Sequence, residues 1–146
     1  MKRNDEIKVS FGIYDFQCSF DEITSLVGFS PDKTLLKGSK IKLANGKELN
    51  NRVMQNAWFI ESYSNNPEGL IQEQFEYHMK SILDRLTPHL HAVKQLNKEY
   101  HLEFSVNGYV DGSNIGLNLK PEYLRVISDF GASLDIDIYS LGDNED

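Results

Sequence analysis

Apolar and polar residues alternate in several stretches of the chain, and this period of two is typical of strands with one buried face. The alternation is clearest near the two ends, in residues 7–13 and 133–140. A further strand is predicted in "NAWFIESYS" (residues 56–64), around the sole tryptophan, Trp58. The chain therefore contains at least three segments that should pair into a sheet.

The last of these segments, "LDIDIYSL", divides its side chains cleanly between two faces. Its apolar side chains should point towards helices, and they are Leu134, Ile136 and Ile138. Its opposite face carries Asp135, Asp137 and Tyr139. The two carboxylates should lie about 6–7 Å apart, because a strand rises about 3.3 Å per residue.

Turn residues predict two hairpins. Asn45-Gly46 in "KIKLANGKELNNRV" (residues 40–53) suits a type I′ turn between two strands. Asp111-Gly112 should join a strand over "HLEFSVNGYV" (residues 101–110) to another over "NIGLNL" (residues 114–119). By contrast, the Pro, Asp and Gly of "FSPDKTLLKGSK" (residues 29–40) predict a connecting loop.

Capping residues mark the predicted helices. Ser19 and Glu22 form a capping box that opens a short helix, and Gly28 should end it. Pro121 should open the last helix, which closes at Gly131.

The longest helix is predicted between residues 67 and 86. Asn66-Pro67 should start it, and its buried face should comprise Leu70, Phe75, Met79, Ile82, Leu83 and Leu86. Pro88 should break it, because proline lacks the backbone donor that the helix needs. Thr87 can then cap a second helix that runs through Leu90, Val93 and Leu96.

These elements predict one α+β domain over residues 1–146, a sandwich of mostly antiparallel strands with helices packed on one face. Strand, short helix, glycine and further strand follow one another near both ends, which allows two related β-α-β halves. Residues 141–146 should form a mobile acidic tail.

The balance of acidic and basic residues indicates which kinds of partner the protein can bind. The chain has 15 Lys and Arg against 22 Asp and Glu, a formal charge of −7. Such a balance argues against nucleic-acid binding and against docking on anionic membranes. It favours a basic protein partner, steered in by surface acids such as Glu61, Glu68, Glu73, Asp143 and Glu145. No secretory signal or membrane span is recognisable, so we expect a cytoplasmic protein.

Candidate chemistry is sparse. Asp135 and Asp137 could contribute to a metal site or share a proton, but an oxygen-ligated metal needs more ligands than these two. We therefore expect them to be solvated or hydrogen-bonded on the polar face of an antiparallel strand. Cys18 is the only cysteine, so it cannot form an intrachain disulfide. It lies before a helix without a recognisable base, and we expect a packed, inert residue.

The four histidines do not have metal-site spacing. They are expected to be exposed or partly packed, and they are His78, His89, His91 and His101. No P-loop, nucleophile elbow or zinc-protease helix is present in the sequence. The prediction is therefore no catalytic residue, no cofactor and no metal.

Several motifs follow one another along the chain: "DEITSLVGFSPD", the following "KGS", "AWFIES", a long helix that ends near a proline, and "LRVISDFGASLDIDIYS". Their order resembles that of a bacterial family, the domain of unknown function numbered 4279. The matching positions, of unknown role, are Gly28, Gly38, Trp58, Glu61, Ser62, Gly131, Asp137 and Tyr139. The resemblance implies a single cytoplasmic domain without an assigned reaction, and it carries no catalytic residue to this chain.

Three functions remain open. The first is a non-enzymatic protein-binding module that covers a basic partner, by analogy with small acidic immunity proteins that neutralise toxins. The second is a small-molecule or metal-dependent enzyme that uses Asp135 and Asp137. The third is a structural homo-oligomer, such as a homodimer, whose exposed strand edge pairs with a second copy.

Overall fold

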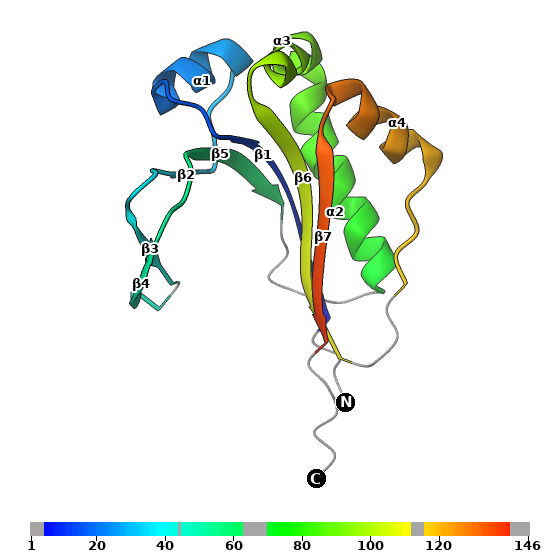
Figure 1. Cartoon of the computed structure of the whole chain (residues 1–146). Coiled ribbons are helices and arrows are strands. Elements are labelled where there is room, and N and C mark those ends of the chain that lie inside the picture. Colours follow the sequence, from blue (N-terminus) through cyan, green and yellow to red (C-terminus); the bar gives the residue numbers. More distant parts are fainter. Residues whose placement is uncertain (1–4, 44, 63–69, 112–115, 141–146) are drawn as a thin grey trace.

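The structure is a computed structural model that describes residues 5–43, 45–62, 70–111 and 116–140. Within these residues, five strands form one sheet in the order β2-β5-β1-β6-β7 (Figure 1). The strands are β1 (Glu6–Tyr14), β2 (Lys33–Leu35), β5 (Ala57–Ser62), β6 (His101–Val110) and β7 (Ser133–Ser140). Neighbouring strands are antiparallel except β6 and β7, which are parallel. The predicted α+β class is confirmed.

Helices cover one side of this sheet (Figure 1). They are α1 (Phe20–Val27), α2 (Ile71–Leu86), α3 (Leu90–Gln95) and α4 (Pro121–Phe130). The long helix α2 packs across β1 and β5, α4 contacts β7, and α3 contacts both α1 and α4.

Alternation along the strands builds the core, as predicted. The strand side chains buried under the helices are Ile7, Val9, Phe11, Ile13, Trp58, Ile60, Leu102, Phe104 and Val106. At the centre the Phe11 ring lies 5.0 Å from Phe104 and 6.0 Å from Phe130. Each such side chain contributes about 1.5–3 kcal/mol through its removal from water.

The predicted helix ends at glycine are confirmed. The Ser19 hydroxyl accepts a hydrogen bond from the Glu22 backbone at 3.1 Å and caps α1. Gly28 ends α1 with φ 89°, and Gly131 ends α4 with φ 67°. Both values lie in the left-handed region that glycine adopts without strain.

The long helix ends at Leu86 as predicted but begins later than predicted. It begins at Ile71, because Leu70 has an extended backbone (ψ 149°), and Asn66-Pro67 lie outside the described residues. Leu70 is 63% exposed, which contradicts its predicted burial. The break at Pro88 is confirmed by a 3-10 turn over Thr87–His89 followed by α3. Thr87 does not cap α3, because its hydroxyl donates back to the Leu83 carbonyl at 2.7 Å.

Two segments were predicted with the wrong structure. Residues 29–40 contain the short edge strand β2 instead of loop alone. Residues 116–119 of the expected strand "NIGLNL" have no regular structure, while its first two residues and Gly112 lie outside the described residues. The Gln72 side chain bonds both the N–H (2.7 Å) and the carbonyl (2.9 Å) of Asn118, which gives this backbone partners other than a strand.

The final strand lies in the predicted register but at the edge of the sheet. Leu134 and Ile138 pack against the core, whereas Ile136 is 44% exposed. An edge strand has a neighbour on one side only, so helices cover it less completely. β7 is also parallel to β6, not antiparallel to it as the sequence suggested.

The two proposed halves share only part of their topology. In β6-α4-β7 the parallel strands are adjacent. In β1-α1-β2 the two strands are also parallel, but β5 pairs between them. The common β-α-β order therefore produces two different strand arrangements.

Strands β3 (Lys40–Lys42) and β4 (Glu48–Arg52) form a separate two-stranded sheet. We call residues 36–53 the arm; it stands apart from the helices in Figure 1. The predicted hairpin is confirmed, but its turn is not a two-residue type I′ turn at Asn45-Gly46, because the Gly46 N–H donates to the Leu43 carbonyl at 2.9 Å. Instead the Leu43 and Lys47 backbones close a longer loop in which Gly46 has φ 86°.

Candidate functional site

The sheet side opposite the helices is a polar surface, which we call the open face. Its side chains alternate with those of the core along the same strands. They are Glu6, Lys8, Ser10, Gly12 and Tyr14 of β1, Phe59 and Glu61 of β5, His101, Glu103, Ser105, Asn107 and Tyr109 of β6, and Ser133, Asp135, Asp137 and Tyr139 of β7.

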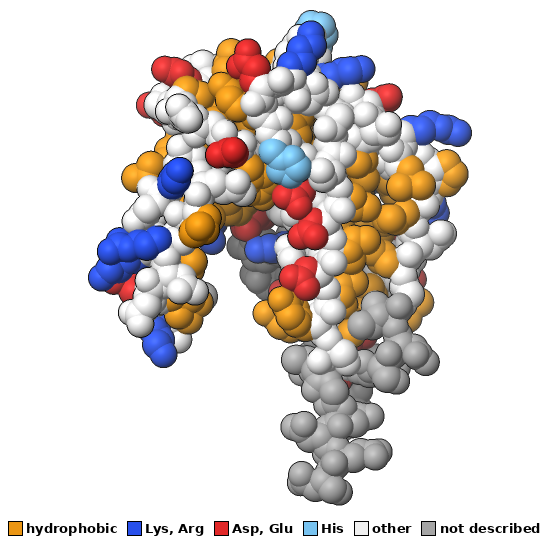
Figure 2. All heavy atoms as spheres, viewed as in Figure 1, with side chains coloured by type: hydrophobic (Ala, Val, Ile, Leu, Met, Phe, Trp, Pro, Cys, Tyr) orange, Lys and Arg blue, Asp and Glu red, His pale blue; other side chains and the backbone are white. Residues whose placement is uncertain are grey.

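The carboxylates of Glu103, Asp135 and Asp137 form an acidic row along the β6–β7 side of the open face. Asp135 lies beside Ser105 and Asp137 beside Asn107 in the parallel register, and Glu103 is on the neighbouring strand. Figure 2 shows acidic side chains in a line on this side of the molecule. Asp135 and Asp137 are exposed, as predicted, so the line is open to a partner from solvent.

Glu61 joins this face from β5, where it is already paired. The Lys8 ammonium lies 2.9 Å from the Glu61 carboxylate, whose side chain is 15% exposed. Lys8 therefore neutralises the inner carboxylate, while Asp135 and Asp137 at the outer edge have no lysine or arginine partner among the described residues.

Tyr14 lies flat on the sheet beneath this row. A Cβ atom built on Gly12 would come within 2.5 Å of Tyr14 Cε2 and 2.6 Å of its hydroxyl, so only glycine leaves room for the ring. Burial, followed by the negative charge of Glu103, raises the pKa of the Tyr14 phenol, while a hydrogen bond with Ser105 acts in the opposite direction. The phenol therefore stays protonated at neutral pH and can serve as a neutral hydrogen-bond donor.

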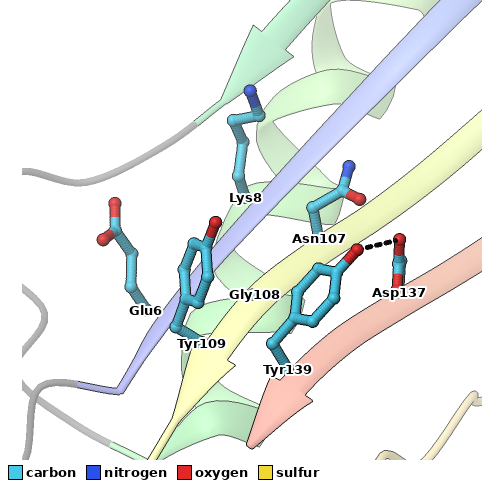
Figure 3. A pocket seen from close by; sticks show the side chains of 7 residues that line it. All are labelled: Glu6, Lys8, Asn107, Gly108, Tyr109, Asp137 and Tyr139. Atoms are coloured by element: carbon cyan, nitrogen blue, oxygen red, sulfur yellow. Dashed lines mark hydrogen bonds between the residues drawn. The ribbon is translucent and has the colours of Figure 1, made fainter. Parts of the chain in front are cut away.

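A pocket of about 330 Å³ lies at one end of the open face (Figure 3). It is lined by Glu6, Lys8, Asn107, Gly108, Tyr109, Asp137 and Tyr139. The rings of Tyr109 and Tyr139 stack at 5.7 Å, and the Tyr139 hydroxyl donates to Asp137 at 3.1 Å. That hydrogen bond raises the pKa of Tyr139. Aromatic rings beside a carboxylate are suited to an organic cation such as a lysine or arginine side chain.

The family-matching positions separate into two groups. Glu61, Asp137 and Tyr139 lie on the open face, as described above. The others serve the fold, and they are Gly28, Gly38, Trp58, Ser62 and Gly131.

The structural group includes two side-chain contacts in the core. The buried Trp58 indole donates to the Thr24 hydroxyl at 3.0 Å. Ser62 lies 2.8 Å from His78 Nδ1. His78 is 1% exposed, which corrects its predicted exposure, and burial lowers its pKa. A neutral imidazole enclosed between α2 and β5 has a packing role.

The remaining nucleophile and metal candidates do not converge. Cys18 is half-buried, with its sulfur 3.7 Å from the Tyr100 hydroxyl. His89 packs on Phe29, whereas His91 and His101 are exposed. In the part of the chain that the structure describes, no three His, Cys, Asp or Glu side chains group closely enough to hold a metal ion. The expectation of a protein without metal or cofactor stays a prediction.

The two predicted steering acids that the structure describes do not share a surface. Glu61 is paired with Lys8, and Glu73 lies on α2, on the other side of the sheet. Glu68, Asp143 and Glu145 lie outside the described residues. The carboxylates that do share a surface are those of Glu103, Asp135 and Asp137. From the sequence, Asp135 and Asp137 were expected to be solvated or hydrogen-bonded, with an enzyme site as the alternative, and Glu103 was assigned no role.

Sequence reasoning also missed how unevenly the charge is distributed. The arm carries Lys37, Lys40, Lys42, Lys47 and Arg52 against Glu48 alone, a formal charge of +4. The rest of the chain consequently carries −11. In Figure 2 the basic arm and the acidic row face each other across a hollow. A net charge counted over short windows would have found this separation.

Comparison with known families agrees with the motif order in the sequence. Residues 5–141 match a family model described as "Domain of unknown function (DUF4279)". The chain belongs to the DUF4279 family. No curated protein and no solved structure matches this DUF4279 domain significantly. Within the described ranges, none of its helices is long and apolar enough to cross a membrane. The open face and the arm are thus the features of this DUF4279 domain on which a functional proposal can rest.

Proposed function

We propose that this DUF4279 domain is a non-enzymatic bacterial cytoplasmic protein that binds a basic protein partner on its open face, in the manner of an immunity-type antidote. The observation that carries the proposal is the placement of Glu103, Asp135 and Asp137 together on the sheet side away from the helices. A rigid sheet holds these carboxylates in fixed positions, so a complementary row of lysines or arginines could pair with several at once.

The pocket supports the same proposal. Tyr109 and Tyr139 are 52% and 54% exposed, and large exposed aromatic side chains are enriched where proteins bind one another. A lysine or arginine of the partner would contact these rings and the Asp137 carboxylate together. Lys8 also lines the pocket, but its ammonium is already paired with Glu61.

An enzyme that uses Asp135 and Asp137 has less support. Both side chains are exposed on an edge strand. Acid–base catalysis by carboxylates usually depends on a site that excludes water and separates their pKa values. The buried histidine, His78, lies on the other side of the sheet.

A lysine-rich peptide is a suitable first probe, because its charge can be matched by a glutamate-rich control peptide. The on-rate should fall steeply as salt increases, since the Debye length shrinks from about 30 Å at 0.01 M to about 8 Å at 0.15 M. The variant Asp135→Lys/Asp137→Lys should bind much more slowly than wild type.

The matched control is Asp84→Lys/Asp129→Lys, which changes the net charge equally at two exposed positions on α2 and α4. It should retain most of the wild-type on-rate. If both variants lost on-rate equally, or if the on-rate did not depend on salt, the open face would not be the surface that binds the peptide. The same pair of variants then serves to identify the natural partner, which should co-purify from native lysate with the control variant and not with the open-face variant.

A further inference from the structure

We propose that the arm of one copy docks on the open face of a second copy, so that the protein forms a two-fold symmetric dimer with reciprocally exchanged arms. The two surfaces have opposite charge. The arm carries +4, whereas β1, β5, β6 and β7 place five carboxylates on the open face against the ammonium of Lys8, and these are Glu6, Glu61, Glu103, Asp135 and Asp137. The proposal shares the open face with the proposed function but requires no foreign partner.

The arm has the properties of a segment that needs a partner surface. None of its described residues is buried, and β3 and β4 pair only with each other. Leu36 and Leu43 are 58% and 41% exposed, and Met54 beside the arm is 84% exposed. A lone two-stranded hairpin is at best marginally stable in water, so burial of these side chains would stabilise it.

The open face of a second copy offers matching chemistry. Lys40 and Lys42 are two residues apart on a strand, as are Asp135 and Asp137, so both pairs have the same spacing of about 6–7 Å. Within one copy, Lys40 forms an ion pair with Glu48 at 3.4 Å, and both side chains are about half exposed. Such an exposed pair stabilises the fold little, so Lys40 can exchange it for a carboxylate of the second copy at small cost in free energy. The exposed rings of Tyr109 and Tyr139 provide apolar contact for leucines of the arm.

The root of the arm holds it away from the open face of its own chain. The Asn56 side chain accepts from the Lys37 backbone at 2.8 Å and donates to the Phe16 carbonyl at 2.7 Å, which ties the root to the body. A hollow separates arm and acidic row within one copy (Figure 2). A second copy can occupy that hollow, and because each chain carries both surfaces, two copies form a closed pair with two equivalent contacts.

Reciprocal charge reversal tests the dimer. The arm variant is Lys40→Glu/Lys42→Glu, and the open-face variant is Asp135→Lys/Asp137→Lys. As the protein concentration increases, the mass of the wild type in solution should rise from that of one copy to that of two copies. In low salt this rise should occur at a lower concentration. Each variant alone should remain a single copy, because like charges then meet at both contacts. An equimolar mixture of the two variants should recover the two-copy mass, since both contacts again join opposite charges.

Matched controls reverse the same number of charges on the helices. Lys80→Glu/Lys94→Glu and Asp84→Lys/Asp129→Lys, all at exposed positions, should dimerise as wild type does. Thermal melting confirms that each variant is folded before its mass is measured. A wild type that stays a single copy at all concentrations, variants that dimerise normally, or a folded mixture that does not associate would each overturn the exchanged-arm dimer. Pairing through the exposed β7 edge would produce the second of these results.

The experiments distinguish a failure of the proposed dimer from a failure of the proposed function. The arm variant, as a single copy, leaves its open face free and should bind the lysine-rich peptide at least as fast as wild type. If it does not bind while the dimer behaves as expected, the proposed function fails alone. If wild type is a single copy that binds the peptide in a salt-dependent manner, the dimer fails alone.

Discussion

Replacement of Gly12 by alanine should destabilise the protein through Tyr14, its neighbour on the open face. Gly12 does not have a positive φ, so alanine can adopt its backbone conformation. On propensity alone the change should stabilise the strand by about 0.5–1 kcal/mol, because glycine is more flexible in the unfolded chain. The new methyl group, however, would lie 2.5–2.6 Å from the Tyr14 ring and hydroxyl, which must therefore move.

The displaced ring loses two contributions. Its hydrogen bond with Ser105 is worth about 1 kcal/mol, and the packing of the half-buried ring on the sheet about 1–2 kcal/mol. After subtraction of the propensity gain, Gly12→Ala should lower the free energy of unfolding by about 1–2 kcal/mol. In a Tyr14→Ala background the obstacle is gone, and the same substitution should raise that free energy by about 0.5–1 kcal/mol.

Urea unfolding of the four proteins in this double-mutant cycle measures the effect. Trp58 is the only tryptophan and is fully buried, so its fluorescence reports the transition. The change of sign between the two backgrounds is the decisive observation, because residues in contact couple and distant ones add. If Gly12→Ala had the same effect in both backgrounds, or stabilised the wild type, Tyr14 would not occupy the position above Gly12.

Three further predictions concern other parts of the molecule. Gly131→Ala should lower the free energy of unfolding by about 1–2 kcal/mol, because φ is 67° and the added Cβ meets the Asn97 side chain; Gly116→Ala, in open space, should be nearly neutral in the same urea titration. Hydrogen bonds from Arg85 lower the pKa of Asp32 below its usual 3.8, so this carboxylate stabilises the fold above that pH and the contribution is lost as pH falls through the folded pKa. The stability difference between wild type and Asp32→Asn should therefore shrink towards acid, from at most about 1 kcal/mol near neutrality because the pair is partly exposed; a difference that grows in acid would contradict this assignment. Metal analysis of protein purified without chelator should find no stoichiometric ion, and one zinc or manganese per chain would show that ligands were overlooked.

Local signals in the sequence predicted most of the individual elements. The alternation in β1, β6 and β7 and the glycines after α1 and α4 act over a few residues, so the chain carries this information without reference to its partners. The predictions failed where a distant contact decided the outcome. Asn118 is held by Gln72 of α2, and β2 exists because its backbone pairs with β5.

Strand order, and therefore which side chains share a surface, likewise depends on contacts between residues that are far apart in the sequence. The sequence indicated that Asp135 and Asp137 share a polar face but not which strand they lie beside. The parallel pairing of β7 with β6 places them beside Ser105 and Asn107, on the strand that also carries Glu103, and the pairing of β1 with β6 places Tyr14 beneath the acidic row. Side chains that are about 30 or 120 residues apart in the chain become neighbours only through these backbone hydrogen bonds.

The sequence by itself thus determined the α+β class, the main core strands and the family, because these depend on residue periodicity, caps and motif order. Only the tertiary structure decided which strand Asp135 and Asp137 lie beside, that they gather with Glu103 and two tyrosines on the open face, and that the basic residues 36–53 form a separate arm. The physical reason is that a strand specifies which of its side chains point the same way, whereas its neighbours in the sheet are selected by the packing of the whole chain.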